Sequence, residues 1–243
     1  MKSNITSLFA VLAAFALGPS MAQAQGGIDT NKKVDSEWIS YRDAYKTMVW
    51  FEKFGKSKNL IQNRFQIVVK EKQVSFDTVR LTLNSKSGVM NLNLDPLGQT
   101  QLPLLKAAYD ENAELSITPR IGQFSFRSRV SILLRADGNY EMSDLRTACE
   151  QSLSFLSSLD PAGMNGKKCV GVKFAFDKKD SSAAVELRTH QSTHQAVGIQ
   201  DNVLLWQDSN IQLKVAQVRF DTNFDKSHLV TRSSPLIAIA VIE

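Results

Sequence analysis

The sequence predicts a mainly β protein, in which antiparallel strands form a sandwich-like core and two helices pack against it, at the border of the α+β class. Two observations predict the strands. Apolar and polar residues alternate in several short segments, as in strands with one buried face, and Gly, Pro and Asn separate these segments at short intervals. A third observation predicts the helices: in segments 36–54 and 144–159 the apolar residues recur at steps of three and four.

The first helix is expected from Ser36 to Phe54, and Gly55 follows it at the position where a left-handed cap is usual. Its apolar stripe is rich in aromatic residues and consists of Trp38, Tyr41, Ala44, Tyr45, Met48 and Phe51. Trp50 and Phe54 fall on the other side of the helix. If these two are exposed, they form a contact patch; if they are buried, which is the favoured interpretation, the helix lies between two layers.

The period changes to two after this helix. Segment 65–69 is a short strand, and segments 78–83 and 90–94 alternate apolar with polar residues. The loop 84–88 between them ends in glycine and predicts a hairpin. Segment 95–98 (DPLG) is a second turn, with proline and glycine where a tight turn requires them.

The clearest strand of the chain is 123–135. One face is apolar, with Phe124, Phe126, Val130, Ile132 and Leu134, and the other carries Arg127, Arg129 and Arg135, with Arg120 just before the strand. Residues two apart on a strand stand ~6.6–6.8 Å apart on one face, a spacing that suits a phosphate or carboxylate. The commoner alternative is a solvated face, on which arginine stems cover apolar surface while their charged ends lie in water.

The second helix, about 144–159, is expected to start at a Ser143 cap and to bury Cys149 on its inner side. Cys149 and Cys169 are the two cysteines of the chain, and in an oxidising compartment they are expected to form a structural disulfide. That bond ties the helix to the strand at 170–176. A metal site is disfavoured because no histidine or third cysteine lies at ligand spacing, and a redox motif because there is no C-x-x-C.

The first 24 residues have the pattern of a secretory signal peptide. Lys2 gives a positive start, segment 8–17 (LFAVLAAFAL) is apolar, and segment 22–24 (AQA) places small residues before a cut that leaves Gln25 first. Ten apolar residues are too few to span ~30 Å of hydrocarbon, so no membrane span is expected. We therefore expect a periplasmic protein, with secretion from the cell as the alternative, and a disordered leader over 25–35.

The rest of the chain is expected to form one main β-rich domain with both helices over residues 36–176. Segment 177–182 (DKKDSS) is a candidate linker. Segment 184–243 contains about four further strands. Sixty residues are few for an independent core, so this segment is expected to complete the sheet or to form a small second lobe packed on it.

Sequence motifs for catalysis are missing, among them G-x-S-x-G, H-E-x-x-H and a glycine-rich nucleotide loop. His190 and His194 lie four apart and are weak candidates for zinc or copper ligands, with His228 as a third ligand brought in by folding. The favoured alternative is two solvated histidines in a polar connector. No cofactor and no metal are expected. The net charge of +5 is mild and spread along the chain, and nucleic acid is not an expected partner.

Four stretches, YRDAYKTMVWFEKFGKSKNL, LTLNSKSGVMNLNLDPLGQTQLPL, RADGNYEMSDLRTACEQSL and KKCVGVKF, resemble an uncharacterised family of exported Gram-negative proteins that carries a domain-of-unknown-function label. The resemblance covers about two thirds of the exported part. The hairpin that ends in LDPLGQTQLPL is also similar to hairpins of transthyretin-like and carboxypeptidase-regulatory β-sandwiches. Such modules are typically non-catalytic, and neither resemblance supplies a functional residue.

The leading functional hypothesis is an exported binding or accessory module of the cell envelope that is not an enzyme. Its expected partner is an envelope protein or an anionic small molecule. Arg127, Arg129, Trp50 and Phe54 are its candidate contact residues. The alternative is a periplasmic hydrolase or metal-dependent enzyme, with a site assembled from scattered residues such as His190 and His194.

Overall fold

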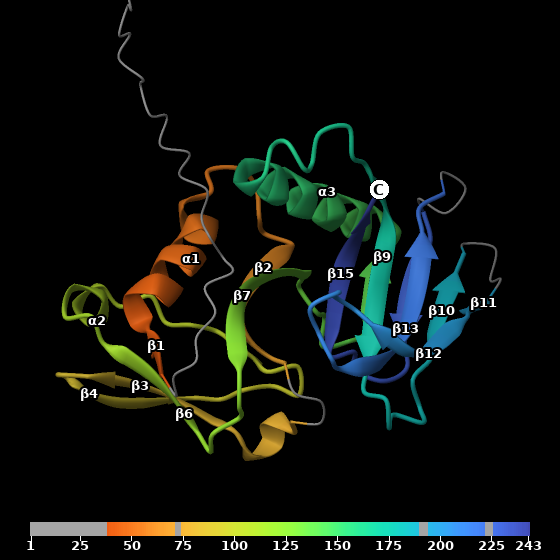
Figure 1. Ribbon diagram of the computed structural model, residues 1–243. Helices are drawn as coiled ribbons and strands as arrows, with labels where there is room; N and C mark the ends of the chain where they lie inside the picture. Colours follow the sequence, from red (N-terminus) through yellow and green to blue (C-terminus); the bar gives the residue numbers. More distant parts are fainter. Residues whose placement is uncertain (1–37, 71–73, 190–193, 222–225) are drawn as a thin grey trace, which may run out of the picture.

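The computed structural model describes residues 38–70, 74–189, 194–221 and 226–243 (Figure 1). The expected signal peptide, its cut site and the leader over 25–35 lie outside the described residues. Within the described ranges the protein is mainly antiparallel β with two long helices, so the predicted fold class is confirmed.

The first half of the chain contains the elements β1 (Trp38–Ser40), α1 (Tyr41–Lys53), β2 (Ile61–Val69), the 3₁₀ turn η1 (Phe76–Thr78), β3 (Arg80–Ser85), β4 (Gly88–Leu92), β5 (Gln99–Thr100), α2 (Lys106–Asp110), β6 (Glu114–Thr118) and β7 (Phe124–Ile132). The second half contains β8 (Asn139–Glu141), α3 (Met142–Leu159), β9 (Cys169–Phe176), β10 (Val185–Arg188), β11 (His194–Val197), β12 (Ile199–Leu204), β13 (Gln212–Arg219), β14 (His228–Thr231) and β15 (Ile237–Ile242).

The described strands form three sheets. A seven-stranded sheet has the order β12-β13-β9-β15-β7-β2-β5, and two four-stranded sheets have the orders β1-β6-β3-β4 and β11-β10-β14-β8. Helix α3 packs across β9 and β15 of the large sheet, whereas α1 packs against β2 and β7 (Figure 1). None of the described helices is long and apolar enough to cross a membrane.

Helix α1 begins five residues later than predicted. Residues 38–40 form β1, whose backbone pairs with β6, so the helix starts only at Tyr41. The Ser40 hydroxyl caps it by accepting a hydrogen bond from the Asp43 amide. At the other end the Lys58 ammonium donates to the carbonyl oxygens of Phe51 and Glu52 in the last turn, and the Phe51 carbonyl also accepts from the Phe54 amide.

Helix α3 begins two residues earlier than predicted, at Met142, and its N-cap position is Glu141, which makes no side-chain capping bond. The predicted Ser143 cap is therefore wrong. The preceding strand β8 pairs with β14 and already holds the chain at the helix entrance. The helical spacing predicts an inner side of Leu145, Ala148, Cys149, Leu153 and Leu156. The first three are buried, and the last two are half-buried.

The second half of the chain repeats the arrangement of the first. In each half a short strand runs directly into a long helix, and a long strand and a hairpin follow. The four-stranded sheet β1-β6-β3-β4 corresponds strand for strand to β8-β14-β10-β11. The large sheet corresponds in the same way, because β7, β2 and β5 mirror β15, β9 and β13 about its centre.

The registers of the two small sheets agree as well. Leu115 lies between Ile39 and Leu83 in the first sheet. In the second sheet Leu229 lies between Tyr140 and Leu187. All six side chains are buried, so equivalent positions face equivalent cores.

The entrances to the two helices are also equivalent. The first amide of α1, Tyr41, donates to the Ala113 carbonyl at 2.9 Å, and the first amide of α3, Met142, donates to the Ser227 carbonyl at 3.0 Å. The buried positions that share spacing in both helices are Tyr41, Ala44, Met48 and Phe51 in α1 and Met142, Leu145, Cys149 and Ser152 in α3. Strand pairing, helix entrance and burial together identify a duplicated unit.

The two halves join where β7 pairs with β15, at Ile132 and Ala238. The boundary between them therefore falls between β7 and β8, whereas the candidate linker 177–182 is the connection from β9 to β10. Segment 184–243 supplies β12, β13 and β15 to the large sheet and β10, β11 and β14 to the second small sheet. One apolar cluster consists of buried residues of the first half, whereas the other combines buried residues of the second half with Phe51, Ile61 and Ile132 of the first.

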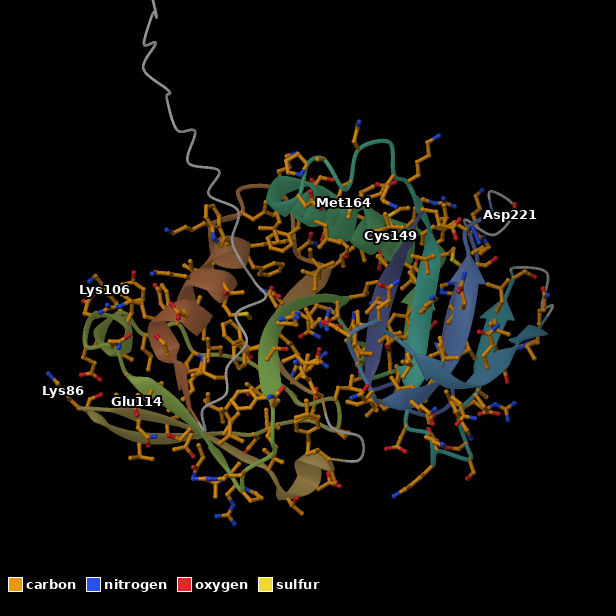
Figure 2. All side chains as sticks on the ribbon, viewed as in Figure 1. Lys86, Lys106, Glu114, Cys149, Met164 and Asp221 are labelled. Atoms are coloured by element: carbon orange, nitrogen blue, oxygen red, sulfur yellow. A yellow bond between two sulfur atoms is a disulfide. The ribbon has the colours of Figure 1, made fainter. Side chains whose placement is uncertain are left out.

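The predicted disulfide is confirmed. Cys149 and Cys169 are bonded, with their Cα atoms 5.8 Å apart, and the bond joins α3 to the start of β9. Cys149 lies on the side of the helix that faces the large sheet (Figure 2). The covalent link therefore fixes the helix to the sheet in the second half.

Candidate functional site

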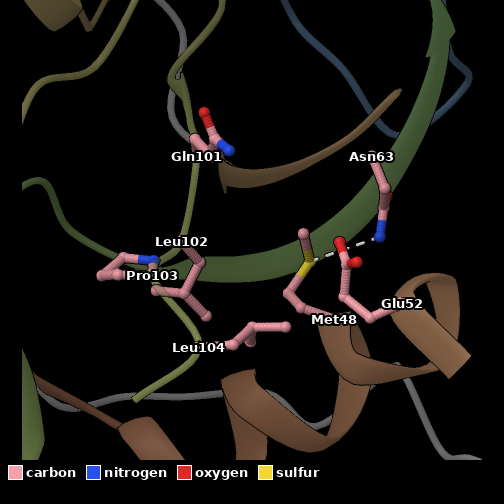
Figure 3. A pocket seen from close by; sticks show the side chains of 7 residues that line it. All are labelled: Met48, Glu52, Asn63, Gln101, Leu102, Pro103 and Leu104. Carbon is pink, nitrogen blue, oxygen red and sulfur yellow. Dashed lines mark hydrogen bonds between the residues drawn. The ribbon is translucent and has the colours of Figure 1, made fainter. Parts of the chain in front are cut away.

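An open cavity of about 490 Å³ lies in the first half, between α1, β2 and the segment that follows β5 (Figure 3). It is lined by Met48, Glu52, Asn63, Gln101, Leu102, Pro103 and Leu104. Its volume falls within the range of small-molecule sites, which combine an apolar lining with a few polar groups. The sequence analysis did not identify this cavity, because its walls come from three separate segments.

Tyr41 holds one wall of the cavity in place. Its hydroxyl donates to the Pro103 carbonyl oxygen at 2.5 Å and accepts from the Leu105 amide at 2.7 Å. The ring is fully buried, and this burial raises the pKa of the Tyr41 hydroxyl, so the hydroxyl stays protonated and keeps both bonds. The segment 102–104 is thereby tied to the first turn of α1.

The floor of the cavity is apolar and its edge is polar. Met48 and Leu102 are buried, and Pro103 and Leu104 are half-buried beside them. Glu52, one turn after Met48, and Gln101 are exposed at the edge. The lining residues thus include one acid and no base, which favours a neutral or cationic ligand over an anion.

Asn63 supplies a hydrogen-bond donor inside the cavity. Its Oδ1 accepts from the Ser128 hydroxyl at 2.7 Å, which fixes the orientation of the amide. Among the described residues, the hydrogen-bond partner of its Nδ2 is the Met48 sulfur, at 3.7 Å (Figure 3). A thioether is a weak acceptor, so this amide group retains donor capacity for a carbonyl or hydroxyl oxygen of a ligand.

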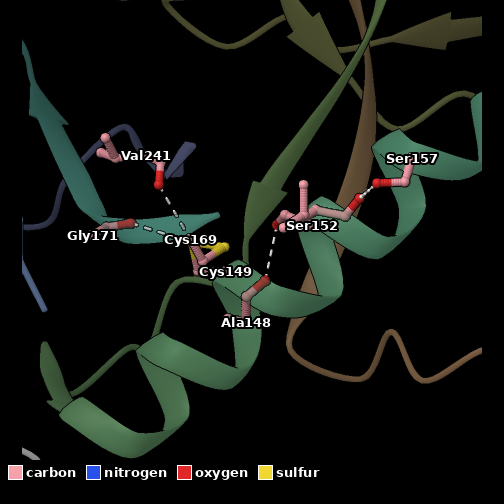
Figure 4. The surroundings of a disulfide bond; sticks show 8 residues. Ala148, Cys149, Ser152, Ser157, Cys169, Gly171 and Val241 are labelled. Carbon is pink, nitrogen blue, oxygen red and sulfur yellow. Dashed lines mark hydrogen bonds between the residues drawn. A yellow bond between two sulfur atoms is a disulfide. The ribbon is translucent and has the colours of Figure 1, made fainter. Parts of the chain in front are cut away.

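The position of Met48 in α1 has a different role in the equivalent helix α3 of the second half. Cys149 of α3 is equivalent to Met48 of α1, since both lie seven residues after the first helical residue. Cys149 is bonded to Cys169 and lies near the Gly171 and Val241 carbonyl oxygens (Figure 4). The helix is therefore cross-linked to its sheet in one half, whereas in the other a methionine lines a cavity.

The predicted arginine pair is already occupied by a carboxylate of the chain itself. The Nε of Arg127 and the Nη2 of Arg129 donate to the two oxygens of Asp208, at 2.9 and 2.5 Å. Arg129 also donates to Gln66 and stacks over the Trp206 ring, with its Cζ 4.5 Å from the ring centroid. The two arginines thus bind a carboxylate of the protein itself, and an external anion would compete with Asp208.

Burial and charge act in opposite directions on this group. Burial raises the pKa of Asp208, but the hydrogen bonds and charges of Arg129 and Arg127 outweigh it and hold the pKa below its ordinary value. Burial lowers the pKa of Arg129, and Asp208 opposes that effect. Asp208 is therefore ionised at neutral pH and pairs with the Arg129 guanidinium.

The other predicted arginines lie elsewhere. Arg135 is exposed and pairs with Asp137, two residues along the same turn, and Arg120 is exposed in the connection from β6 to β7. The structure therefore brings together only Arg127 and Arg129 of the four.

Trp50 and Phe54 do not form one patch. Phe54 packs edge-on against Phe155 of α3, with ring centroids 5.3 Å apart. Trp50, by contrast, is 48% exposed. Burial, the favoured interpretation for both, holds for Phe54, which is half-buried, and is wrong for Trp50.

Two of the three histidines are described, and His190 lies outside the described residues. His194 on β11 and His228 on β14 both pair with Arg188 of β10, one on each side. The carboxylate nearest to His194 is that of Glu186, at 3.9 Å, and it also binds Arg188 and Arg232. Within the described ranges, no three histidine, cysteine or acidic side chains are grouped as a metal site requires.

Comparison with known proteins adds no relative from which a function could be transferred: no family model, curated protein or solved structure matches the chain.

Proposed function

We propose that the protein is an exported, non-catalytic binding module of the cell envelope, and that its ligand site is the cavity beside α1. The observation that carries this proposal is the side-chain amide of Asn63 above an apolar floor: its Nδ2 donates to the Met48 sulfur, which is a weak acceptor. Met48, which lines the cavity, is equivalent in the duplicated fold to Cys149, which forms the disulfide of the second half.

The cavity chemistry favours a neutral amphipathic ligand. An apolar group of about the size of a leucine or phenylalanine side chain would contact Met48 and Leu102, while a carbonyl or hydroxyl oxygen would accept from Asn63. Glu52 at the edge would disfavour an anion and tolerate an amine. Such a ligand is either a small molecule or an apolar side chain of an extended envelope protein segment.

The proposed location is the periplasm, with secretion from the cell as the alternative. The charge, apolar run and small residues of segment 1–24 support export. The Cys149–Cys169 bond supports an oxidising compartment. Fractionation tests this: cleavage after Ala24 and recovery from the periplasm are expected, and an uncleaved protein in the cytoplasm would contradict it.

Fluorescence titration with N-phenyl-1-naphthylamine, a neutral apolar fluorophore, tests the cavity. We expect saturable enhancement with the wild type and binding at least about tenfold weaker in Leu104→Glu, because a carboxylate would then face the apolar floor. Leu133→Glu is the matched control, since Leu133 is 41% exposed and lies away from the cavity. Equal binding by Leu104→Glu and wild type, with unchanged circular dichroism, would overturn the assignment of the cavity.

The alternative function is a metal-dependent enzyme or hydrolase, and metal analysis of the purified exported protein separates the two. A binding module is expected to carry no stoichiometric metal. Zinc or copper at one equivalent, lost in a His190→Ala/His194→Ala variant, would favour the enzyme.

A further inference from the structure

The outer face of α1 carries a stripe of basic residues around one exposed aromatic ring. Lys46, Trp50 and Lys53 follow one another at helical steps of four and three, and Lys56 lies in the loop just beyond the helix. All four are exposed, with Trp50 at 48%. These four residues are named the basic stripe.

The basic stripe is not neutralised within the described chain. The described ion pairs include none with Lys46, Lys53 or Lys56. Of the two acidic residues of α1, Glu52 lines the cavity, whereas Asp43 lies in the first turn, three residues before Lys46 on the same side of the helix. Three positive charges therefore face solvent along about 10 Å or more of helix.

The duplicated fold shows that this chemistry is not required to build the helix. The positions of α3 equivalent to Lys46, Trp50 and Lys53 are Thr147, Gln151 and Ser154, all uncharged. Gln151 is buried, and its side chain bonds the Leu60 amide and Asn59. One half thus uses this face for internal packing, whereas the other half exposes a tryptophan among lysines.

We propose that the basic stripe docks the protein on a membrane surface rich in anionic phospholipid. A tryptophan ring has an apolar body and a polar N–H, and it partitions into the headgroup layer of a bilayer. Lysine ammonium groups on either side would lie at the phosphate level, with their stems along the apolar boundary. A soluble polyanion would use the lysines and leave the exposed indole without a role, so the exposed Trp50 favours the membrane.

This inference rests on one part of the proposed function, the export of the protein to the cell envelope, where it would meet a membrane surface. Helix α1 carries the basic stripe on one side and one wall of the cavity, through Met48 and Glu52, on another. Docking through the stripe would therefore hold the cavity close to the membrane surface.

Co-sedimentation with vesicles tests the proposal. We expect the purified exported protein to bind vesicles of phosphatidylcholine with about 30% phosphatidylglycerol and not vesicles of phosphatidylcholine alone. The variant Lys46→Gln/Lys53→Gln should bind about 30-fold more weakly, since each lysine near an anionic surface contributes about 1 kcal/mol. The matched control is Lys178→Gln/Lys179→Gln, which removes the same charge from the exposed β9–β10 connection and should retain binding.

Trp50→Ala separates a membrane from a polyanion. On anionic vesicles it should weaken binding at low and at moderate salt, because the ring contribution is not screened. Equal loss in the control double variant, or no loss in Lys46→Gln/Lys53→Gln, would overturn the proposal. The proposal would also be overturned if the protein bound dextran sulfate as tightly as anionic vesicles and if Trp50→Ala left the affinity for dextran sulfate unchanged. Fluorophore binding in the cavity is read separately, so failure of one proposal is distinguishable from failure of the other.

Discussion

The guanidinium of Arg129 lies 2.5 Å from the carboxylate of Asp208, although 79 residues separate them in sequence. Arg129 belongs to β7 in the first half, and Asp208 to the connection between β12 and β13 in the second. The same connection is fixed by Asn210, whose side-chain amide donates to the Val69 and Lys70 carbonyl oxygens. These contacts join the two halves on the face of the large sheet opposite α3.

We expect Asp208→Ala to lower the free energy of unfolding by about 1–2 kcal/mol, because Arg127 and Arg129 would lose charge-assisted hydrogen bonds while staying largely buried. Urea denaturation measures the change. Glu243→Gln is the control: it removes the partner of Arg219 in a pair that is more than half exposed, and less than about 0.5 kcal/mol is expected. Equal effects of the two substitutions would mean that the buried pair does not join the halves.

The pH dependence of stability has a defined sign at Asp208. Because its pKa is lower in the folded than in the unfolded protein, its contribution is present above the ordinary Asp value of about 3.9 and is lost as the pH falls through the folded pKa. Asp208→Asn should therefore lose less stability between pH 5 and pH 3 than the wild type does. A parallel pH profile for the two proteins would contradict this.

Asp95 is expected to behave in the opposite way. Burial raises its pKa, although its Oδ1 accepts from the Leu97 and Gln99 amides at 2.9 and 2.8 Å. The charged form therefore costs stability, which falls as the pH rises from the unfolded towards the folded pKa. Asp95→Asn keeps an acceptor without the charge and should be neutral or stabilising at pH 7, whereas Asp95→Ala should cost about 1–2 kcal/mol. Thermal unfolding at pH 7 of both variants checks the order.

Removal of the disulfide should destabilise the second half. Cys149→Ser/Cys169→Ser frees a loop with a sequence separation of 20 residues, and about 3 kcal/mol of stability should be lost. Urea denaturation of the oxidised wild type and the double variant measures the loss. Two free thiols in the exported protein, found by mass spectrometry, would contradict the bond itself.

Tyr41→Phe should loosen the cavity wall. The substitution keeps the buried ring but leaves the Pro103 carbonyl and the Leu105 amide without their partner, at a cost of about 1–2 kcal/mol. Hydrogen exchange at the Leu105 amide should accelerate. Tyr140→Phe is the control in the equivalent half, since the Tyr140 hydroxyl bonds only the Arg135 amide, away from the cavity, and it should leave exchange at Leu105 unchanged.

Periodicity in the sequence was sufficient to predict the class of the fold and the two helices. The positions of proline and glycine predicted the turn at 95–98, and the presence of two cysteines in an exported chain predicted the disulfide. These features depend on neighbours in sequence or on chemistry that few residues can perform. Gly98, for example, has a φ of 70° in the predicted turn, and a Cβ there would lie 2.5 Å from the Phe76 ring. The start of α1 was predicted too early because β1 gains its hydrogen bonds from β6, about 75 residues away, and no local pattern contains that partner.

Tertiary structure alone decided the duplication, the cavity and the state of the arginine pair. The alternation of residues along β7 correctly predicted that Arg127 and Arg129 lie on the face opposite its core residues. It could not predict their ion pairs with Asp208, because those contacts depend on how the two halves pack together. The duplication is a repeat of strand order and register, which arises from pairing between strands far apart in sequence. The sequence therefore determined which side chains turn towards a core, and the packing of distant segments determined which of the remaining ones face a partner, a cavity or solvent.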